Sequence, residues 1–258
     1  RPEIIVHAAG LVGGIQANIK DPINFLDVNM IIGRNLISSA HSLSVPNLIN
    51  ISSTCMYPRA AANPLQENML LTGALEPTNE GYALAKLITT RLCQYIDKDY
   101  DNLNYKSLIA CNLYGRYDKF ESDKSHLLAA IIRKIHFAKS VGSESVDIWG
   151  DGSARREFMY AGDFADAVIR AVLEIEALPD IMNISMGYDL SINDHYQTVA
   201  DALEWHGHFH HDLSKPVGMS QKLACIRRRS KWGWKPRTCL REGVRSAYKY
   251  FLEYCSED

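Results

Sequence analysis

The sequence predicts an α/β protein built on an open, mostly parallel β-sheet, with a smaller α/β lobe formed by its C-terminal part. Two observations predict the sheet. Short runs rich in Ile, Val and Leu alternate with helical patterns, and those helical patterns are about a dozen residues long or longer. Such alternation is typical of βαβ units, in which a crossover helix connects two parallel strands. A third observation predicts the lobe, because the alternation stops after Tyr188.

Two strands and two long helices are expected in the N-terminal half. Glu3–Ala9 and Asn47–Ser52 are short, mainly apolar runs, as expected for strands that a parallel sheet buries on both faces. Pro22–Leu43 carries apolar residues at helical spacing, and Tyr82–Tyr100 shows a second helical pattern. The stretch 54–81 between them has no such periodicity and is expected to be irregular.

The remaining elements continue the alternation and then change character. They are strands at Tyr105–Asn112, Ser145–Trp149 and Ile181–Ser185, and helices at His126–Lys139, Asp163–Glu176, Ile192–Trp205 and Leu240–Tyr254. In an open α/β sheet, ligands bind outside the carboxyl ends of the strands. The residues that directly follow a predicted strand, such as Ser53, Cys55 and Asn112, are therefore candidates for a site.

The composition excludes several classes of protein. The net charge is −2 over 258 residues, so no basic field points to nucleic acid. No apolar run approaches the roughly 20 residues that span a bilayer, so no membrane partner is expected. The six cysteines form no C-x-x-C pair and suit neither a zinc site nor a disulfide framework. We therefore expect reduced thiols and a cytoplasmic protein.

Four clustered histidines invite a metal-site hypothesis. They are His206, His208, His210 and His211. No carboxylates stand near them at ligand spacing, so a solvated loop is the better prediction and no metal is expected.

Tyr82 and Lys86 form the first candidate catalytic pair. Residues four apart on a helix face the same side, and a nearby ammonium is expected to lower the pKa of a phenol, normally near ~10. Such a phenol can exchange a proton with a carbonyl or alkoxide. A surface Tyr beside a solvated Lys is the alternative. Ser53 favours the catalytic interpretation, because it ends the preceding strand, where its hydroxyl can orient the same carbonyl.

These residues resemble the short-chain dehydrogenase/reductases. The motifs of the extended branch, which acts on nucleotide sugars, are matched by His7-Ala8-Ala9, Tyr82-Ala83-Leu84-Ala85-Lys86 and Asn112-Leu113-Tyr114-Gly115. Further segments closely resemble the GDP-L-fucose synthases within that branch: Val12-Gly13-Gly14-Ile15, Ser53-Thr54-Cys55-Met56-Tyr57-Pro58, Leu75-Glu76-Pro77-Thr78-Asn79-Glu80, Ser125-His126 and Arg156-Glu157-Phe158. The similarity extends over nearly the whole chain and is weakest from Asp189 to Trp234.

The resemblance implies an NADPH-dependent enzyme that epimerises C3 and C5 of a GDP-4-keto-6-deoxy sugar and then reduces C4. The C4 ketone acidifies both carbons, so inversion needs a base and an acid. Cys55 would be the base and His126 the acid, since a thiol titrates near ~8.5 and an imidazole near ~6.5. Tyr82 would protonate the C4 oxygen while Ser53 hydrogen-bonds it, and Lys86 would also hold the nicotinamide ribose. The alternatives are that Cys55 only packs in the core and that His126 only caps a helix.

The resemblance also implies residues that hold the two ligands. The NADP-lining residues would be Ile51, Ser52, Ser53, Thr54, Tyr82, Lys86, Ala110, Cys111, Asn112, Leu113 and His126. The residues that contact the GDP-linked keto-sugar would be Asn112, Lys134, Trp149, Arg156 and Lys215. Arginine suits a diphosphate because its guanidinium donates two parallel hydrogen bonds. For Arg156, a surface ion pair with Glu157 is the alternative.

By this resemblance the fold is a Rossmann-like sheet that lacks its first strands. No glycine-rich turn follows a first strand, so the sequence is expected to begin at about the fourth strand, and the isolated chain to bind NADPH poorly and to aggregate. Residues 1–121 and 143–185 would form the NADP-binding domain, and 122–142 and 186–258 the substrate lobe. The helices at 22–43 and 82–100 resemble a dimer interface, so a homodimer is expected.

Three positions of the substrate lobe depart from the family pattern. Lys134 replaces an arginine, while Val217 and Cys225 replace acids. These changes leave the chemistry but blur the sugar. The alternatives are a 4-keto reductase of another nucleotide sugar, such as a GDP-keto-heptose, without epimerisation, and a non-catalytic protein with an NAD(P)-binding fold.

Overall fold

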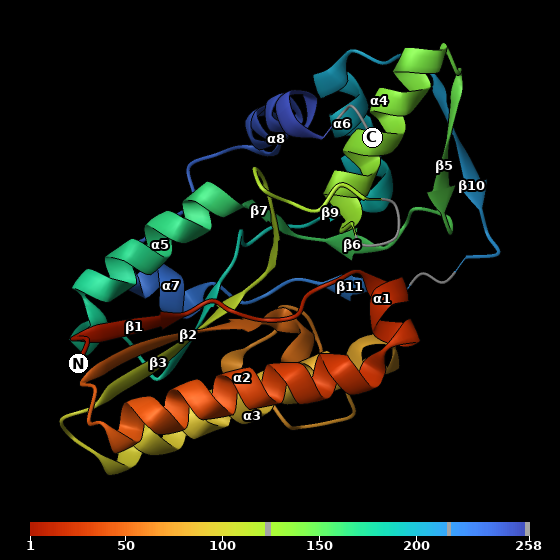
Figure 1. Ribbon diagram of the computed structural model, residues 1–258. Coiled ribbons are helices and arrows are strands. Elements are labelled where there is room, and N and C mark those ends of the chain that lie inside the picture. Colours follow the sequence, from red (N-terminus) through yellow and green to blue (C-terminus); the bar gives the residue numbers. More distant parts are fainter. Residues whose placement is uncertain (122–124, 216–217, 256–258) are drawn as a thin grey trace.

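A parallel four-stranded sheet lies at the centre of the computed structural model, which describes residues 1–121, 125–215 and 218–255 (Figure 1). The strand order is β1-β2-β3-β8, and every pairing is parallel. The strands are β1 (Ile4–His7), β2 (Asn47–Ser53), β3 (Asn104–Ala110) and β8 (Ile181–Ile184). Helices cover both faces of the sheet, so its strands bury many apolar residues, together with polar ones such as Asn50 and Ser107, which confirms the predicted fold class.

Helices cover the two faces. On one face, Ile37 of α2 and Cys93 of α3 pack against Leu48 and Tyr105 of the sheet. On the other face, Phe164 of α5 packs in a cluster that includes strand residues of β2, β3 and β8. Figure 1 shows α2 and α3 side by side below the sheet, with α5 and α7 above it. The bounds are α2 (Pro22–Ser42), α3 (Glu80–Asp99), α5 (Ala161–Leu173) and α7 (Arg227–Trp232).

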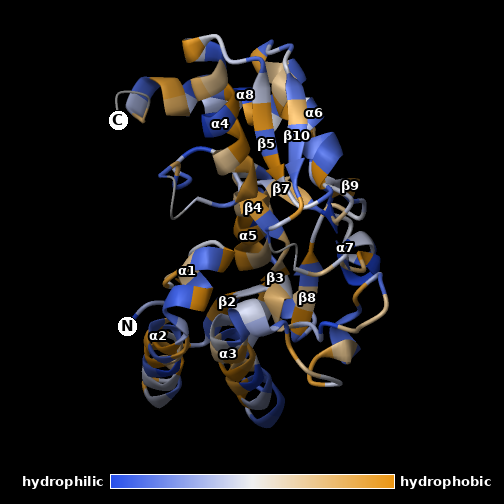
Figure 2. Ribbon diagram, turned by 90° about the vertical axis from the view of Figure 1, so that its right-hand side faces the viewer, coloured by the Kyte–Doolittle hydropathy of each residue, from blue (hydrophilic) through white to orange (hydrophobic). Residues whose placement is uncertain are grey.

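A second apolar cluster forms the core of the C-terminal lobe (Figure 2). Its elements are α4 (Leu127–Val141), β5 (Ser145–Trp149), α6 (Ile192–Leu203), β10 (His208–Asp212) and α8 (Leu240–Tyr254). β5 pairs in parallel with β10, outside the central sheet. This pairing places β5 with the lobe, whereas the predicted division had assigned residues 143–149 to the NADP-binding domain. Alternation along the sequence cannot reveal which sheet a strand joins.

The histidine-rich segment is a strand, not the expected loop. Along β10, Phe209 packs against Tyr196 and Trp205, while His208, His210 and His211 are exposed. From His208 to His210 the side chains alternate between exposed and partly buried, as along a strand, and the adjacent, exposed His211 interrupts this alternation. The strand can be recognised only once its apolar residue has a packing partner. His210 Nδ1 lies 3.1 Å from Asp147 on the neighbouring strand.

Short elements connect the sheet with the C-terminal lobe. β6 (Arg155–Arg156) lies between β9 (Leu190–Ser191) and β11 (Gln221–Lys222), while β4 (Asn112–Tyr114) pairs with β7 (Phe158–Tyr160). The remaining helical elements are α1 (Ile15–Lys20), η1 (Thr54–Met56), η2 (Glu67–Met69), η3 (Pro77–Asn79) and η4 (Ile175–Ala177). Within the described ranges, no helix combines the length and the apolar character needed to cross a bilayer.

Glu157 joins these short elements from within the protein, where only 1% of its surface is exposed. Its Oε1 accepts a hydrogen bond from the backbone N–H of Ala224 at 2.6 Å, and its Oε2 accepts from Met186 and Gly187 at 3.1 and 3.3 Å. The carboxyl group of Glu157 therefore does not form the surface ion pair with Arg156 that was the alternative. Instead it binds the backbone of Met186, Gly187 and Ala224 and so fixes the segment that follows β6.

We expect Glu157→Gln to lower the free energy of unfolding by about 1–3 kcal/mol, because the amide places an N–H group against backbone donors and leaves one unsatisfied. Urea denaturation followed by fluorescence measures this. Glu144→Gln, at an exposed position, is the control and should change stability by less than about 0.5 kcal/mol. Equal effects of the two substitutions would contradict the role of Glu157.

Candidate active site

Ser53, Tyr82 and Lys86 meet at the carboxyl end of β2. Ser53 is the last residue of the strand, and Tyr82 and Lys86 lie in the first two turns of α3. The side chains of Ser53 and Tyr82 are hydrogen-bonded. Lys86 Nζ donates to the carbonyl of Ile51 at 3.0 Å and lies 5.9 Å from the centre of the Tyr82 ring. The structure thus brings together the three residues that the sequence grouped.

The pKa of Tyr82 is shifted opposite to the expected direction. Burial raises it, nearby Cys55 raises it further, and the hydrogen bond with Ser53 opposes both. Burial also lowers the pKa of Lys86. The sequence argument failed because it counted the ammonium and could not count desolvation. A phenol that stays protonated is the form that can donate a proton to a developing alkoxide.

The space beside Lys86 fits a nicotinamide ribose. Lys86 is 8% exposed, and its one hydrogen bond among the described residues leaves donors for another acceptor. A Cβ at Gly10 would lie 3.8 Å from Lys86 Nζ and only 2.9 Å from Asn29 Oδ1. Asn29 accepts from the N–H of Leu11 at 2.8 Å and so fixes this loop. The absence of a side chain at Gly10 therefore leaves room beside the buried ammonium of Lys86 for a polar ligand.

The other residues predicted to line the cofactor lie on the ends of neighbouring strands. Ile51, Ser52 and Thr54 belong to the end of β2 and the start of η1, and Ala110, Cys111, Asn112 and Leu113 belong to β3, β4 and the residue between them. The hydroxyl of Ser52 contacts Thr90 at 2.9 Å and Met56 at 2.9 Å, so it serves packing between strand and helix. Asn112 Nδ2 donates to the carbonyl of Glu157 at 2.9 Å.

The sulfur of Cys55 lies in the same site and faces two nitrogen donors. Asn79 Nδ2 is 3.2 Å from Sγ, and Lys222 Nζ is 3.8 Å from it. Arg156 also interacts electrostatically with Cys55. The pairing of β6 with β11 places Arg156 opposite Lys222. Two cations thus approach the thiol through one short strand pair.

Lys222 is a site residue that the sequence analysis did not select. Only 8% of its surface is exposed, and the sulfur of Cys55 is its one recorded polar partner among the described residues. The segment Gln221-Lys222-Leu223-Ala224-Cys225 offered this lysine as a candidate, but the sequence analysis considered only Cys225, which replaces an acid. A two-residue strand has no periodicity from which its partner can be inferred.

We expect Lys222→Met to slow alkylation of Cys55 by about tenfold, because it removes the ammonium group that lies 3.8 Å from the reacting sulfur. Iodoacetamide labelling followed by mass spectrometry of the Cys55 peptide measures the rate. Lys249→Met on the exposed face of α8 is the matched control. An unchanged labelling rate in Lys222→Met would show that the ammonium does not act on the sulfur.

His126 lies at the N-terminus of α4. It occupies the N-cap position without a side-chain capping bond, and its Nδ1 is 3.8 Å from Asp118. The carbonyl of the preceding Ser125 lies 3.0 Å from the position of a Cβ at Gly14. His126 is thus held beside the glycine loop that follows β1, without recorded contact to Cys55 among the described residues. The capping interpretation does not hold.

Trp149 forms a second cluster with two of the predicted substrate residues. Lys134 Nζ and Lys215 Nζ each lie 5.7 Å from the centre of the Trp149 ring. Lys134 donates to the carbonyl of Asp147 at 2.8 Å, and burial lowers its pKa. Val217, one of the departures from the family pattern, lies outside the described residues. An indole, 44% exposed, with two cations is suited to an anionic ligand that carries an aromatic base.

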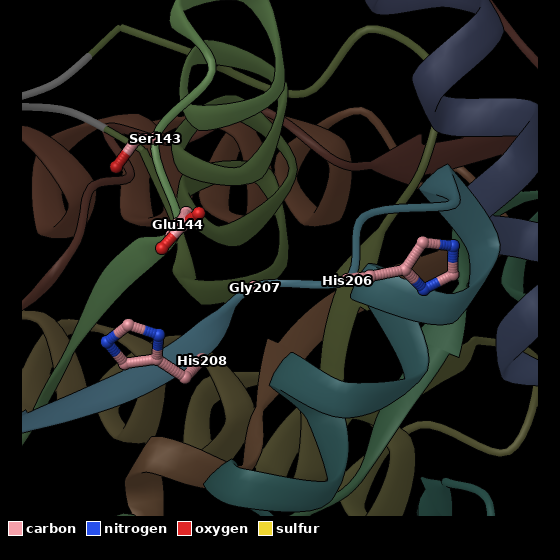
Figure 3. A pocket seen from close by; sticks show the side chains of 5 residues that line it. All are labelled: Ser143, Glu144, His206, Gly207 and His208. Carbon is pink, nitrogen blue, oxygen red and sulfur yellow. The ribbon is translucent and has the colours of Figure 1, made fainter.

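A pocket on the surface lies apart from the residues of the candidate active site and contains none of them. It has a volume of about 300 Å³ and is lined by Ser143, Glu144, His206, Gly207 and His208 (Figure 3). Figure 3 shows the imidazoles of His206 and His208 on opposite sides of Gly207. In the described part of the chain, no group of three or more His, Cys, Asp or Glu is arranged to hold a metal ion.

Comparisons with known proteins give the chain its relatives. Residues 1–185 match the model of the NAD dependent epimerase/dehydratase family. A GDP-L-fucose synthase of Azorhizobium caulinodans is 52% identical over 97% of this chain and 80% of that protein. A GDP-L-colitose synthase of Yersinia pseudotuberculosis is 45% identical over 100% of this chain and 84% of that protein.

Solved structures agree with this relationship. A GDP-6-OMe-4-keto-L-xylo-heptose reductase from C. jejuni superposes with a TM-score of 0.90 at 26% identity, over 98% of this chain and 83% of that one. A GDP-mannoheptose C4 reductase from Campylobacter jejuni with NADP bound has a TM-score of 0.86 at 29% identity, over 97% and 82% of the two chains.

Proposed function

Because the chain belongs to the NAD dependent epimerase/dehydratase family, we propose that it epimerises C3 and C5 of a GDP-4-keto-6-deoxy sugar and reduces C4 with NADPH, giving GDP-L-fucose or a close relative. One observation carries the proposal. The sulfur of Cys55, with its two donors, lies in the same site as Ser53, Tyr82 and Lys86. A carbonyl held between Ser53 and Tyr82 has its neighbouring carbons within reach of a base.

The proposed epimerisation uses Cys55 and His126 in turn. The thiolate takes the proton from C3 or C5, so an S–H bond forms, a C–H bond breaks, and the electron pair moves into an enolate on the C4 oxygen. His126 returns a proton to the opposite face of the carbon. Lys222 and Arg156 stabilise negative charge on the sulfur before the transfer.

The proposed reduction uses the residues at the start of α3. NADPH, when bound, supplies the hydride for C4. Tyr82, protonated because it is buried, gives its proton to the C4 oxygen, and Ser53 hydrogen-bonds the same oxygen. Lys86 holds the nicotinamide ribose. Ile51, Thr54, Ala110, Cys111, Leu113 and Asn112 line that site in this proposal.

The proposed nucleotide site combines Arg156 with the Trp149 cluster. Arg156 binds the diphosphate through its guanidinium, and Lys134, Trp149 and Lys215 bind the guanosine end. The group at C3 of the sugar stays open within the proposal, since both a fucose synthase and a colitose synthase are relatives. Product analysis with the 3-hydroxy and the 3-deoxy keto sugars decides between them.

The test of the proposed function is a product and isotope analysis with GDP-4-keto-6-deoxymannose and NADPH in D₂O. We expect GDP-L-fucose that carries deuterium at C3 and C5. The second candidate is C4 reduction alone, favoured by the structural likeness to GDP-heptose reductases. Reduced product without deuterium at either carbon would support that candidate, and absence of any turnover would overturn both.

The division of the chain and its setting are also part of the proposal. We place the NADP-binding domain at residues 1–121 and 150–185 and the substrate lobe at 122–149 and 186–258. The start of the lobe, at residues 122–124, lies outside the described residues. A cytoplasmic location is supported by the free thiols of Cys55, Cys93, Cys111, Cys225 and Cys239.

A homodimer built on α2 and α3 completes the proposal. Large apolar residues are exposed on both helices: Ile23, Ile31, Leu84, Ile88 and Tyr95. Figure 2 shows hydrophobic residues along both helices at the lower end of the molecule. Several large apolar side chains exposed on two neighbouring helices are expected at a protein interface.

We expect the double substitution Ile31→Glu/Ile88→Glu to convert the dimer into monomers, because it buries two like charges on each side of the interface. Sedimentation velocity measures the change. Leu213→Glu, at a position 74% exposed in the other lobe, is the control and should leave a dimer. A wild-type protein that sediments only as a monomer would contradict the proposed interface.

A further inference from the structure

We infer that Asn79 is a positioning residue for Cys55: its side-chain amide holds the sulfur, as thiolate, for the proton transfers at C3 and C5. The inference rests on the proposed function and adds a residue to it. Asn79 Nδ2 lies 3.2 Å from Cys55 Sγ, closer than the 3.8 Å of Lys222 Nζ. The contact joins two segments that are 24 residues apart in the sequence.

The helix start shows that this contact replaces another one. Asn79 is the N-cap of α3, and asparagine at this position normally accepts a hydrogen bond from the backbone N–H of the second or third helical residue. Here those residues are Gly81 and Tyr82, and Asn79 makes no side-chain capping bond. Its amide is turned to the sulfur instead. The helix thus lacks the stabilising capping hydrogen bond that an asparagine at its N-cap could form.

The far end of the same amide has no partner. Asn79 Oδ1 is buried and lacks a hydrogen bond among the described residues. Buried side-chain oxygens are nearly always paired, so an exception calls for a reason. Packing alone would leave the amide free to turn Oδ1 toward the helix N–H groups. Among the described residues, the hydrogen bond to Cys55 is the only contact that fixes the orientation of the Asn79 amide.

Side-chain contacts hold the turn that carries Asn79. Glu76 caps η3 and accepts from the N–H and the hydroxyl of Thr78 at 3.5 and 3.3 Å, while its other oxygen lies 3.4 Å from Arg59 Nε. Asn79 ends η3 and leads into α3 and Tyr82. The amide that faces the sulfur and the phenol proposed to face the C4 oxygen therefore belong to one continuous segment.

The chemistry favours an amide donor here. A hydrogen bond to the sulfur stabilises the thiolate relative to the thiol, because the donor interacts more strongly with the charged form. It also limits rotation about the Cα–Cβ bond, which sets the position of the sulfur. Since the amide does not titrate, it does not compete with the sulfur for the proton that leaves C3 or C5. Asn79 thereby orients the base and takes no part in the transfer.

The test compares Asn79→Ala and Asn79→Asp with the wild-type protein. Two rates are measured: deuterium exchange at C3 and C5 of the keto sugar, and oxidation of GDP-L-fucose at C4 by NADP⁺. We expect Asn79→Ala to lower exchange about tenfold relative to C4 oxidation, and Asn79→Asp to lower it further because its carboxylate repels the thiolate. The rate of Cys55 alkylation by iodoacetamide should fall severalfold in Asn79→Ala, because the donor that holds the sulfur is gone.

Thr78→Val is the matched control, because it removes the Thr78 hydroxyl from Glu76 in the same turn without touching Cys55. Its exchange rate and its rate of Cys55 alkylation should match the wild type. Equal losses in Thr78→Val and Asn79→Ala, or an unchanged rate of Cys55 alkylation in Asn79→Ala, would overturn the inference. A wild-type protein that reduces C4 without exchange would instead overturn the proposed epimerisation, so the two failures are distinguishable.

Discussion

Tyr82→Phe should reduce the rate of C4 reduction by about 10²–10⁴-fold while C3 and C5 continue to exchange. The phenol is hydrogen-bonded to Ser53, and burial keeps it protonated, so it is the proton donor nearest to a carbonyl held at the end of β2. Phenylalanine fills the same volume and removes only the hydroxyl. The protein fold and the sulfur of Cys55 are left in place.

The rate of NADPH oxidation with the keto sugar measures reduction, and NMR in D₂O measures exchange. Tyr95→Phe is the matched control, because Tyr95 lies on the same helix with 62% of its surface exposed. It should reduce C4 at the wild-type rate. A Tyr82→Phe protein that still reduces within about tenfold of wild type would mean that another group supplies the proton.

Cys55→Ala should have the converse effect. We expect exchange at C3 and C5 to fall by at least about 10²-fold, because the substitution removes the only thiol at the end of β2. Reduction should continue and give a sugar that keeps its original configuration at C3 and C5. Cys55→Ser should behave in the same way, since a hydroxyl is a far weaker acid than a thiol and is not deprotonated by the nearby cations.

Cys225→Ala provides the control for Cys55. Cys225 is a half-buried free thiol three residues after Lys222, outside the set of groups that face Cys55. It should form the epimerised product at the wild-type rate. Product configuration by NMR decides the outcome, and an epimerised product from Cys55→Ala would assign the base to another residue.

The sequence predicted the central sheet because its strands are short, Ile- and Leu-containing runs that alternate with long helical patterns. Ile4–His7, Asn47–Ser53 and Asn104–Ala110 all lie within a few residues of the predicted bounds. It also grouped Ser53, Tyr82 and Lys86, which are close along the chain or joined by a simple helical spacing. Local periodicity carries this information, and burial of both sheet faces makes it strong.

What the sequence did not predict depends on contacts between distant segments. β10 was predicted as a loop because its histidines hid the one apolar residue that packs inward. Lys222 reaches Cys55 only through the two-residue pairing with β6, which has no pattern of its own. The direction of the Tyr82 pKa shift was wrong because desolvation is a property of the folded site.

The pairing of β6 with β11 has a consequence for how such an enzyme can change. The groups for reduction come from β2 and the start of α3, whereas a cation that supports the thiol comes from β11, two residues long and more than 100 residues later in the chain. Epimerisation could thus be lost by altering this remote segment while reduction persists. The two activities therefore depend on separate segments of the chain, and substitutions in β11 alone are expected to turn the enzyme toward reduction without epimerisation.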